Sequence, residues 1–153
     1  MSKKRDVELF LVDIYIAIFK IKNYVSPFVN AQELLHDSLH WDATIRQLEI
    51  IGEAIKNLLL NKEFCQVSPK YFRQIVDFRN IVAHGYFGIN EDEVWDVIHT
   101  KLDQLQNDLK QIIIAIYNLD EAFETTLYYD LKNQDTELKN YLKNLQKEFH
   151  DAR

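Results

Sequence analysis

Only five of the 153 residues are glycine or proline: three glycines and two prolines. In an average protein these two residues together make up roughly 12% of the chain. Tight turns depend on them, because glycine readily adopts positive φ angles and proline holds φ at about −65°. A chain with so few cannot supply the many turns of most all-β and α/β folds. The sequence therefore predicts an all-α fold built from long helices.

Size and composition favour one folded unit with a substantial core. Hydrophobic residues make up 47% of the chain and charged residues 27%, which is typical of a globular domain and not of a disordered chain. A chain of this length buries about two-thirds of its unfolded surface, enough for a core without metal ions or disulfides. Cys65 is the one cysteine, so no disulfide can form within the chain and we expect a cytoplasmic protein.

The charge balance limits the partners that we expect. The net charge is −6, which disfavours overall electrostatic attraction to nucleic acid, so we expect any phosphate contact to be local. Residues 3–5 are basic and precede an apolar segment, as in a signal peptide, but Asp6, Glu8 and Asp13 interrupt that segment. No stretch reaches the ~20 uncharged residues that a membrane span needs. We therefore expect no membrane attachment and interpret residues 6–25 as a buried first helix.

Periodicity predicts the next two helices. Asn30 and Glu33 resemble a capping box that opens a short helix ending near Leu39. The following helix carries an apolar stripe at alternating steps of four and three, in which Gly52 would let a neighbouring helix approach closely. The stripe consists of Trp41, Ile45, Leu48, Gly52, Ile55 and Leu59. A polar stripe beside it consists of Arg46, Glu49, Glu53 and Lys56.

Two further helices complete a predicted bundle. Ser68 and Pro69 are typical of a helix start, and this helix should fade near Gly85. Its core stripe consists of Tyr71, Ile75, Phe78 and Val82. Asn90 and Glu93 cap a helix over 91–118 with the cleanest apolar seam in the chain. Residues 1–118 are thus predicted to form an antiparallel bundle of four to five core helices.

Residues 119–153 differ in composition from the rest of the chain. They are rich in Lys, Asn, Gln and Glu, and a narrow apolar stripe follows heptad spacing. The stripe consists of Leu131, Leu138, Leu142, Leu145 and Phe149. We expect an amphipathic C-terminal helical extension that packs on the bundle or on a partner, and we favour packing within the chain.

The segment 77–86 differs from the pattern of an ordinary bundle helix. If it is helical, at 100° per residue, one polar face carries Arg73, Asp77, Asn80 and His84. Arg79 and Tyr86 lie above one another, about 120–140° around the helix from His84. A straight helix therefore separates these groups. They converge if the helix ends at Gly85, if the Arg79 side chain reaches around, or if a second copy completes the site.

Each of these residues also has an ordinary structural interpretation. Arg73 and Asp77 have the spacing of an ion pair on a wet helix face. Asn80 and His84 at the same spacing can form a surface hydrogen bond near a helix end. Tyr86 can be an interfacial aromatic residue with its hydroxyl in water. Periodicity alone therefore leads to a helical bundle without an assigned function.

Arg79, four intervening residues, His84, Gly85 and Tyr86 resemble the R-x4-H-x-Y signature of HEPN-domain proteins, in particular the HepT-like toxin group. The segment 42–54 looks like the second-helix signature of that group, and 90–95 is similar to the loop and helix that follow its motif. The resemblance covers about residues 6–117. It implies a homodimeric, all-helical ribonuclease in which Arg79 and His84 are catalytic. From their chemistry we assign supporting roles to Asn80, which can orient His84 or donate to phosphate, and to Tyr86, which can stack on RNA or hydrogen-bond to it.

The resemblance also implies a toxin–antitoxin pair of type VII-like organisation. The antitoxin would be a minimal nucleotidyltransferase that silences the toxin by transferring AMP to Tyr86, and the substrate class would be RNA, with transfer RNA as the type reported for members. The residue types fit RNA cleavage by the adjacent 2′-hydroxyl, which needs neither a metal nor a cofactor. A histidine can move the proton, and an arginine can hold the phosphate at two oxygens.

Two other hypotheses compete with this one. Metal catalysis would use His36 and His40 with Asp37, or Glu49 with Glu53, but no further ligands follow at a recognisable spacing. We expect Arg46 and Lys56 to neutralise these glutamates, and a supporting role of Arg46 and Glu49 near the site stays open. The second is a non-catalytic helical module that binds a nucleotide or completes the active site of a nucleotidyltransferase partner.

Overall fold

The computed structural model describes residues 3–83, 89–132 and 135–153, and all regular structure within these ranges is helical. The predicted all-α bundle is confirmed. The elements are α1 (Lys3–Val25), α2 (Ala31–His36), α3 (Ser38–Leu59), α4 (Lys62–Val67), α5 (Phe72–Ala83), α6 (Glu91–Asp96), η1 (Val97–Lys101), α7 (Leu102–Ile116), α8 (Asp120–Thr125), η2 (Thr126–Asp130) and α9 (Thr136–Asp151).

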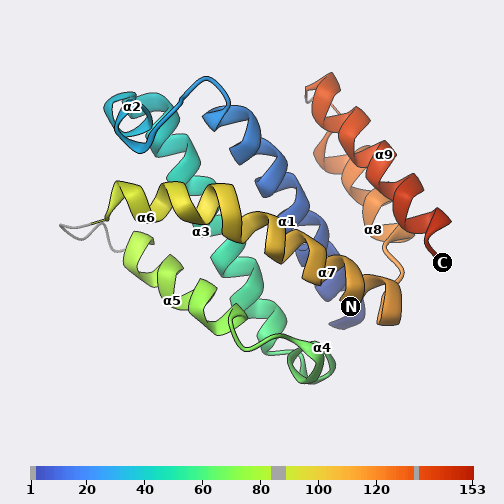
Figure 1. Cartoon of the computed structure of the whole chain (residues 1–153). Coiled ribbons are helices and arrows are strands. Elements are labelled where there is room, and N and C mark those ends of the chain that lie inside the picture. Colours follow the sequence, from blue (N-terminus) through green and yellow to red (C-terminus); the bar gives the residue numbers. More distant parts are fainter. Residues whose placement is uncertain (1–2, 84–88, 133–134) are drawn as a thin grey trace.

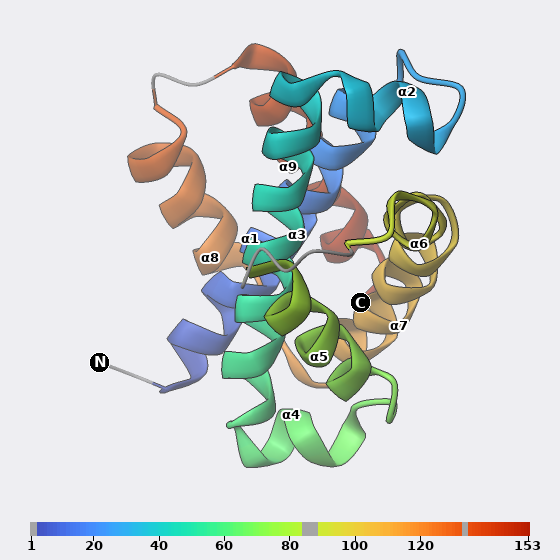
Figure 2. The ribbon, with the colours of Figure 1, turned by 90° about the vertical axis from the view of Figure 1, so that its left-hand side faces the viewer.

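Helices α1 and α3 run antiparallel at the centre of the molecule (Figure 1). Helix α5 packs on α3, and the continuous helix α6–η1–α7 crosses over α1 and α3 (Figures 1 and 2). On the other side of α1 lie α8 and α9. This order places α5 at one edge of the molecule, with α3 as its main support.

Helix α1 is buried on several sides, as its apolar composition predicts. Leu11, Ile14, Ile18 and Ile21 are fully buried, and Tyr15 is nearly so. The hydroxyl of Tyr15 donates a hydrogen bond to the backbone oxygen of Gln106 at 3.1 Å, which fastens α1 to α7. None of the described helices, α1 included, is long and apolar enough to cross a membrane.

The predicted cap at Asn30 is present, but the helix that it opens is shorter than expected. The Asn30 side chain accepts from the backbone N–H of Glu33 at 2.9 Å, and the Glu33 carboxylate accepts from the backbone N–H of Val29 at 3.2 Å. Helix α2 ends at His36, because Asp37 turns the chain and caps α3 by accepting from the N–H of His40. The prediction that this helix reaches Leu39 is wrong.

The prediction of a helix start at Ser68 and Pro69 is also wrong. An earlier cap, Asn61, opens the short helix α4, and Ser68 closes it. The Ser68 hydroxyl donates to the backbone oxygen of Phe64 at 2.7 Å, so this hydroxyl serves a helix end instead of a helix start. A turn follows, in which Pro69 accepts from Phe72, and α5 begins only there.

The long seam helix is confirmed in outline, with a π-helical turn inside it. Asn90 caps α6 by accepting from the backbone N–H groups of Asp92 and Glu93. The turn η1 then widens the helix before α7, which ends at Ile116, two residues earlier than predicted, as the backbone becomes extended at Tyr117. Its buried seam residues are Ile98, Leu102, Leu105, Leu109 and Ile112.

The C-terminal elements pack on α1 of the same chain. The apolar stripe of the extension is buried at Leu131, Leu138, Leu142, Leu145 and Phe149. The Phe149 ring meets Tyr15 of α1 edge to face, with ring centroids 5.7 Å apart. Phe19 of α1 stacks on Tyr141 at 4.4 Å. These contacts make α9 part of the core.

Candidate active site

The structure describes part of the predicted site. Arg79 and Asn80 lie on the last turns of α5, whereas His84 and Tyr86 fall outside the described residues. Within the described residues, the site consists of Arg79, Asn80 and the residues that surround them.

Gly52 brings α5 close to α3 at the position of Arg79. A Cβ atom built on Gly52 would lie 2.1 Å from Cβ of Arg79 and 2.5 Å from its Cγ. Real atoms do not approach so closely, so only a glycine allows the Arg79 stem to lie directly on the α3 backbone. The predicted close approach at Gly52 is confirmed, and the neighbour is the arginine of the motif.

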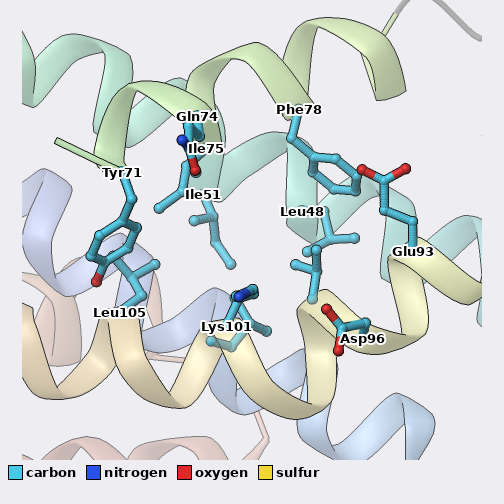
Figure 3. Close-up of a pocket in the computed structure, with 12 residues that line it drawn as sticks. Leu48, Ile51, Tyr71, Gln74, Ile75, Phe78, Glu93, Asp96, Lys101 and Leu105 are labelled. Carbon is cyan, nitrogen blue, oxygen red and sulfur yellow. The ribbon is translucent and has the colours of Figure 1, made fainter.

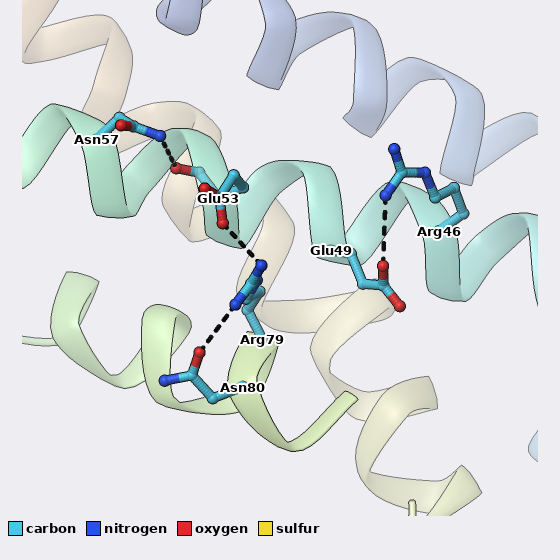
Figure 4. A network of polar contacts seen from close by, with 6 residues as sticks. All are labelled: Arg46, Glu49, Glu53, Asn57, Arg79 and Asn80. Carbon is cyan, nitrogen blue, oxygen red and sulfur yellow. Dashed lines mark hydrogen bonds and ion pairs between the residues drawn. The ribbon is translucent and has the colours of Figure 1, made fainter. Parts of the chain in front are cut away.

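The guanidinium of Arg79 is held at both of its terminal nitrogens (Figure 4). Its Nη2 forms an ion pair with Oε2 of Glu53 at 2.8 Å, and its Nη1 donates to Oδ1 of Asn80 at 3.1 Å. Its Nε is buried and has no hydrogen-bond partner among the residues that the structure describes. About a quarter (26%) of the side chain remains exposed, so the head group is anchored by the protein and still reaches the surface.

Arg79 lines a recess of about 180 Å³ between α1, α3 and α5. The recess is lined by Phe10, Asp13, Arg46, Glu49, Ile50, Glu53, Ala54 and Arg79. Arg46 and Glu49 form an ion pair across one turn of α3 at 3.4 Å (Figure 4). Partial burial in the recess, and the nearby carboxylate of Asp130, raise the pKa of Asp13 to about 6. The site thus combines two cations with three carboxyl groups.

The neutralisation of the two glutamates differs from the prediction in one respect. Arg46 pairs with Glu49 as expected, but Glu53 pairs with Arg79 and not with Lys56. Sequence spacing favours a partner one turn away, yet the partner comes from another helix because Gly52 brings that helix into contact. The adjacent Gly52 and Glu53 are the signal that could have suggested it: a small residue for close approach, followed by an acid.

Another local prediction on α5 is wrong. Among the described residues, no ion pair joins Arg73 to Asp77; Arg73 instead places Nη2 3.9 Å from Sγ of Cys65. The short helix α4 causes this, because it brings Cys65 beside the first turn of α5. Phe72, the first residue of α5, is fully buried and stacks on Phe64 of α4.

The opposite face of α5 borders a separate, mostly apolar cavity of about 240 Å³ (Figure 3). Tyr71, just before α5, and Ile75 and Phe78 of α5 point into it from one side. Glu93, Asp96 and Lys101 lie along the other side. The Tyr71 hydroxyl donates to Asp108 of α7 at 2.5 Å and fixes the start of α5. Arg79 and Asn80 do not line this cavity, and Arg79 lines the separate recess between α1, α3 and α5.

Of the two histidines considered as metal ligands, His40 has contacts that the structure describes. Nδ1 of His40 lies 2.9 Å from the carboxylate of Asp37, and its ring meets Phe28 edge to face. Within the described ranges, no three histidine, cysteine, aspartate or glutamate side chains are grouped as a metal ion would require.

Comparison with known proteins identifies the family of this chain. The family model described as "Ribonuclease HepT-like" matches residues 14–112, which include α3 and α5. The protein named "Putative RNase MJ0127" from Methanocaldococcus jannaschii is 32% identical over 125 residues, or 81% of this chain and 98% of that protein. The "Probable ribonuclease HepT" of Thermococcus cleftensis is 29% identical over 110 residues, or 71% and 97% of the two chains. No solved structure gives a significant match. The chain belongs to the HepT-like ribonuclease family.

Proposed function

We propose that this ribonuclease is a metal-independent endoribonuclease toxin that uses Arg79 and His84 as its catalytic residues. The observation that carries the proposal is the arrangement of Arg79, which is anchored by Glu53 and Asn80 yet reaches the surface, five residues before His84 in a HepT-like chain. An anchored and exposed guanidinium at this point suits phosphate binding better than a purely structural role.

The reaction follows from the chemistry of these side chains. The 2′-oxygen of a ribose attacks the adjacent phosphorus while the bond from phosphorus to the 5′-oxygen breaks, which leaves a cyclic phosphate and a free 5′-hydroxyl. His84 moves the proton, a contribution of about 10²–10⁴-fold. Arg79 stabilises the charge that builds up on the phosphate oxygens. Asn80 orients Arg79 through the hydrogen bond at 3.1 Å.

A homodimer supplies the surface that RNA requires. Residues 68–88 carry three cations, Lys70, Arg73 and Arg79, against the single acid Asp77, although the whole chain is acidic. Two copies related by a twofold axis double this local positive charge and place two Arg79–His84 pairs on one cleft. The substrate is RNA, with transfer RNA as the first class to test, and the protein acts in the cytoplasm, where that RNA is found.

The same site accounts for regulation by a nucleotidyltransferase antitoxin. The hydroxyl oxygen of Tyr86 attacks the α-phosphorus of ATP, pyrophosphate leaves, and the hydroxyl proton passes to solvent. The attached AMP adds bulk and a negative charge two residues from His84. It therefore opposes the binding of an RNA phosphate by shape and by charge.

Arg79→Ala and His84→Ala test the catalytic assignment. Each variant is expected to abolish RNA cleavage and growth arrest, and to keep the helical far-UV circular dichroism of the wild type. Gln74→Ala is the control, because Gln74 lies on the same helix, is exposed, carries no charge and does not line the recess. Cleavage by purified His84→Ala at the wild-type rate would show that the assignment is wrong.

Incubation with the cognate nucleotidyltransferase and ATP tests the role of Tyr86. The mass of one or more AMP groups is expected on the wild type and not on Tyr86→Phe, with a parallel loss of RNA cleavage. Modification elsewhere in the chain would contradict this role. A wild type that neither cuts RNA nor arrests growth when expressed alone would favour the non-catalytic binding module instead.

A further inference from the structure

We propose that Glu53 is a positioning residue for the reaction, because it aims the guanidinium of Arg79 at the scissile phosphate. This inference rests on the proposed function, in which Arg79 binds that phosphate.

Helix α3 holds Arg79 at two points with two consecutive residues. Gly52 receives the stem, at Cβ and Cγ, and Glu53 holds the head through the ion pair at 2.8 Å. Asn80, the next residue on α5, fixes the other terminal nitrogen at 3.1 Å. A long flexible side chain is thus restrained along its whole length, in a position set by the contact between α3 and α5 (Figure 4).

Restraint of this kind contributes to rate more than to fold stability. Arginine has many rotamers, and a free guanidinium must be ordered each time a phosphate is bound. Glu53 is about half exposed (48%), and exposed ion pairs add little to the stability of a protein. Substitution of a residue that served only the fold would lower the melting temperature, whereas substitution of a residue that orients Arg79 would lower the cleavage rate with little change in the melting temperature.

The charge of Glu53 predicts that its replacement affects kcat and KM differently. Its carboxylate lies next to the guanidinium and repels a phosphate that approaches Arg79. Replacing it with a neutral side chain removes that repulsion, so ground-state binding of RNA is kept or becomes tighter. The orientation needed in the transition state is lost at the same time. We expect kcat to fall while KM stays the same or decreases.

The experiment compares Glu53→Gln with Asp42→Asn in the full chain, with an RNA that the wild type cuts. Asp42 is the control, because it is an exposed acid on the same helix and does not line the recess. For Glu53→Gln we expect kcat to fall about tenfold or more, no rise in KM, and a melting temperature within the range of the control. Glu53→Asp keeps the carboxylate and should recover part of the lost kcat.

The outcomes separate this inference from the proposed function. If Arg79→Ala is inactive while Glu53→Gln keeps the wild-type kcat, the positioning role is wrong and the proposed function stands. If Arg79→Ala cuts RNA normally, the proposed function itself fails. A loss of activity in Glu53→Gln that is matched by a fall in melting temperature, or that Asp42→Asn shares equally, would also overturn the positioning role.

Discussion

Gly52 of α3 and Arg79 of α5 are in such close contact that no methyl group fits between the two helices. This close contact is made by the side chain that we propose as catalytic. Packing and the proposed chemistry therefore share Arg79, so a change on α3 that never touches the substrate should still affect the site.

Gly52→Ala is the sharpest test of that coupling. Alanine has the higher helix propensity, by up to about 1 kcal/mol, so the substitution would stabilise an unobstructed helix. Here we expect a net loss of about 1–3 kcal/mol, because the new methyl group displaces Arg79 or separates the helices. Denaturant unfolding measures the stability and a cleavage assay the activity, which should also fall. Lys56→Ala, an exposed change on the same helix, is the control. A Gly52→Ala variant that is more stable than the wild type and fully active would show that the close contact between Gly52 and Arg79 does not limit packing or activity.

The carboxyl group of Asp13 should make stability depend on pH. Its pKa is raised from 3.8 to about 6 in the folded protein, so the folded state binds this proton more tightly than the unfolded state. Its contribution to stability is therefore lost as the pH rises from about 4 to about 6. Asp13→Asn should be more stable than the wild type at pH 7.5, by about 1 kcal/mol or less because the residue is partly exposed to solvent, and this advantage should vanish near pH 4.

Unfolding curves of Asp13→Asn and the wild type at the two pH values measure this difference. Asp42→Asn, an exposed acid on α3, serves as the control. If Asp13→Asn raised the free energy of unfolding equally at both pH values, the stability would not depend on the titration of Asp13.

The C-terminal extension should be required for a stable bundle. Phe149 is 3% exposed and packs between Tyr15 and Phe123, so Phe149→Ala should cost about 3–5 kcal/mol. Removal of residues 119–153 should expose Tyr15 and Phe19 and lower the melting temperature further. Lys147→Ala on the exposed face of α9 is the control. A chain that ends at residue 118 and melts like the wild type would show that the extension is dispensable for folding.

Chelation tests the proposed chemistry from another direction. Cleavage by the 2′-hydroxyl with a histidine and an arginine needs no metal ion, so EDTA should leave the rate unchanged. The measurement is RNA cleavage with and without EDTA, on enzyme purified without added metal. Activity that disappears with EDTA and returns with Mg²⁺ or Zn²⁺ would require a different mechanism.

Features that depend on local periodicity could be read from the sequence. The all-α class, the central helices, the seam of α7 and the cap at Asn30 all follow from the spacing of apolar and capping residues a few positions apart. Even local signals were ambiguous where two helices meet. Ser68 followed by Pro69 has the form of a helix start, but the Ser68 hydroxyl closes α4, because a serine hydroxyl can serve either end of a helix.

The partners of charged residues depended on tertiary structure. Spacing along α3 assigned Glu53 to Lys56, yet α5 delivers Arg79 to within 2.8 Å. A sequence shows which residues share a face of one helix, but it does not show which other helix will cover that face, or at what register. Gly52 indicated that a neighbouring helix approaches α3 closely at this position. Only the tertiary structure shows that the contacting residue is Arg79, because the contact depends on how the two whole helices pack together.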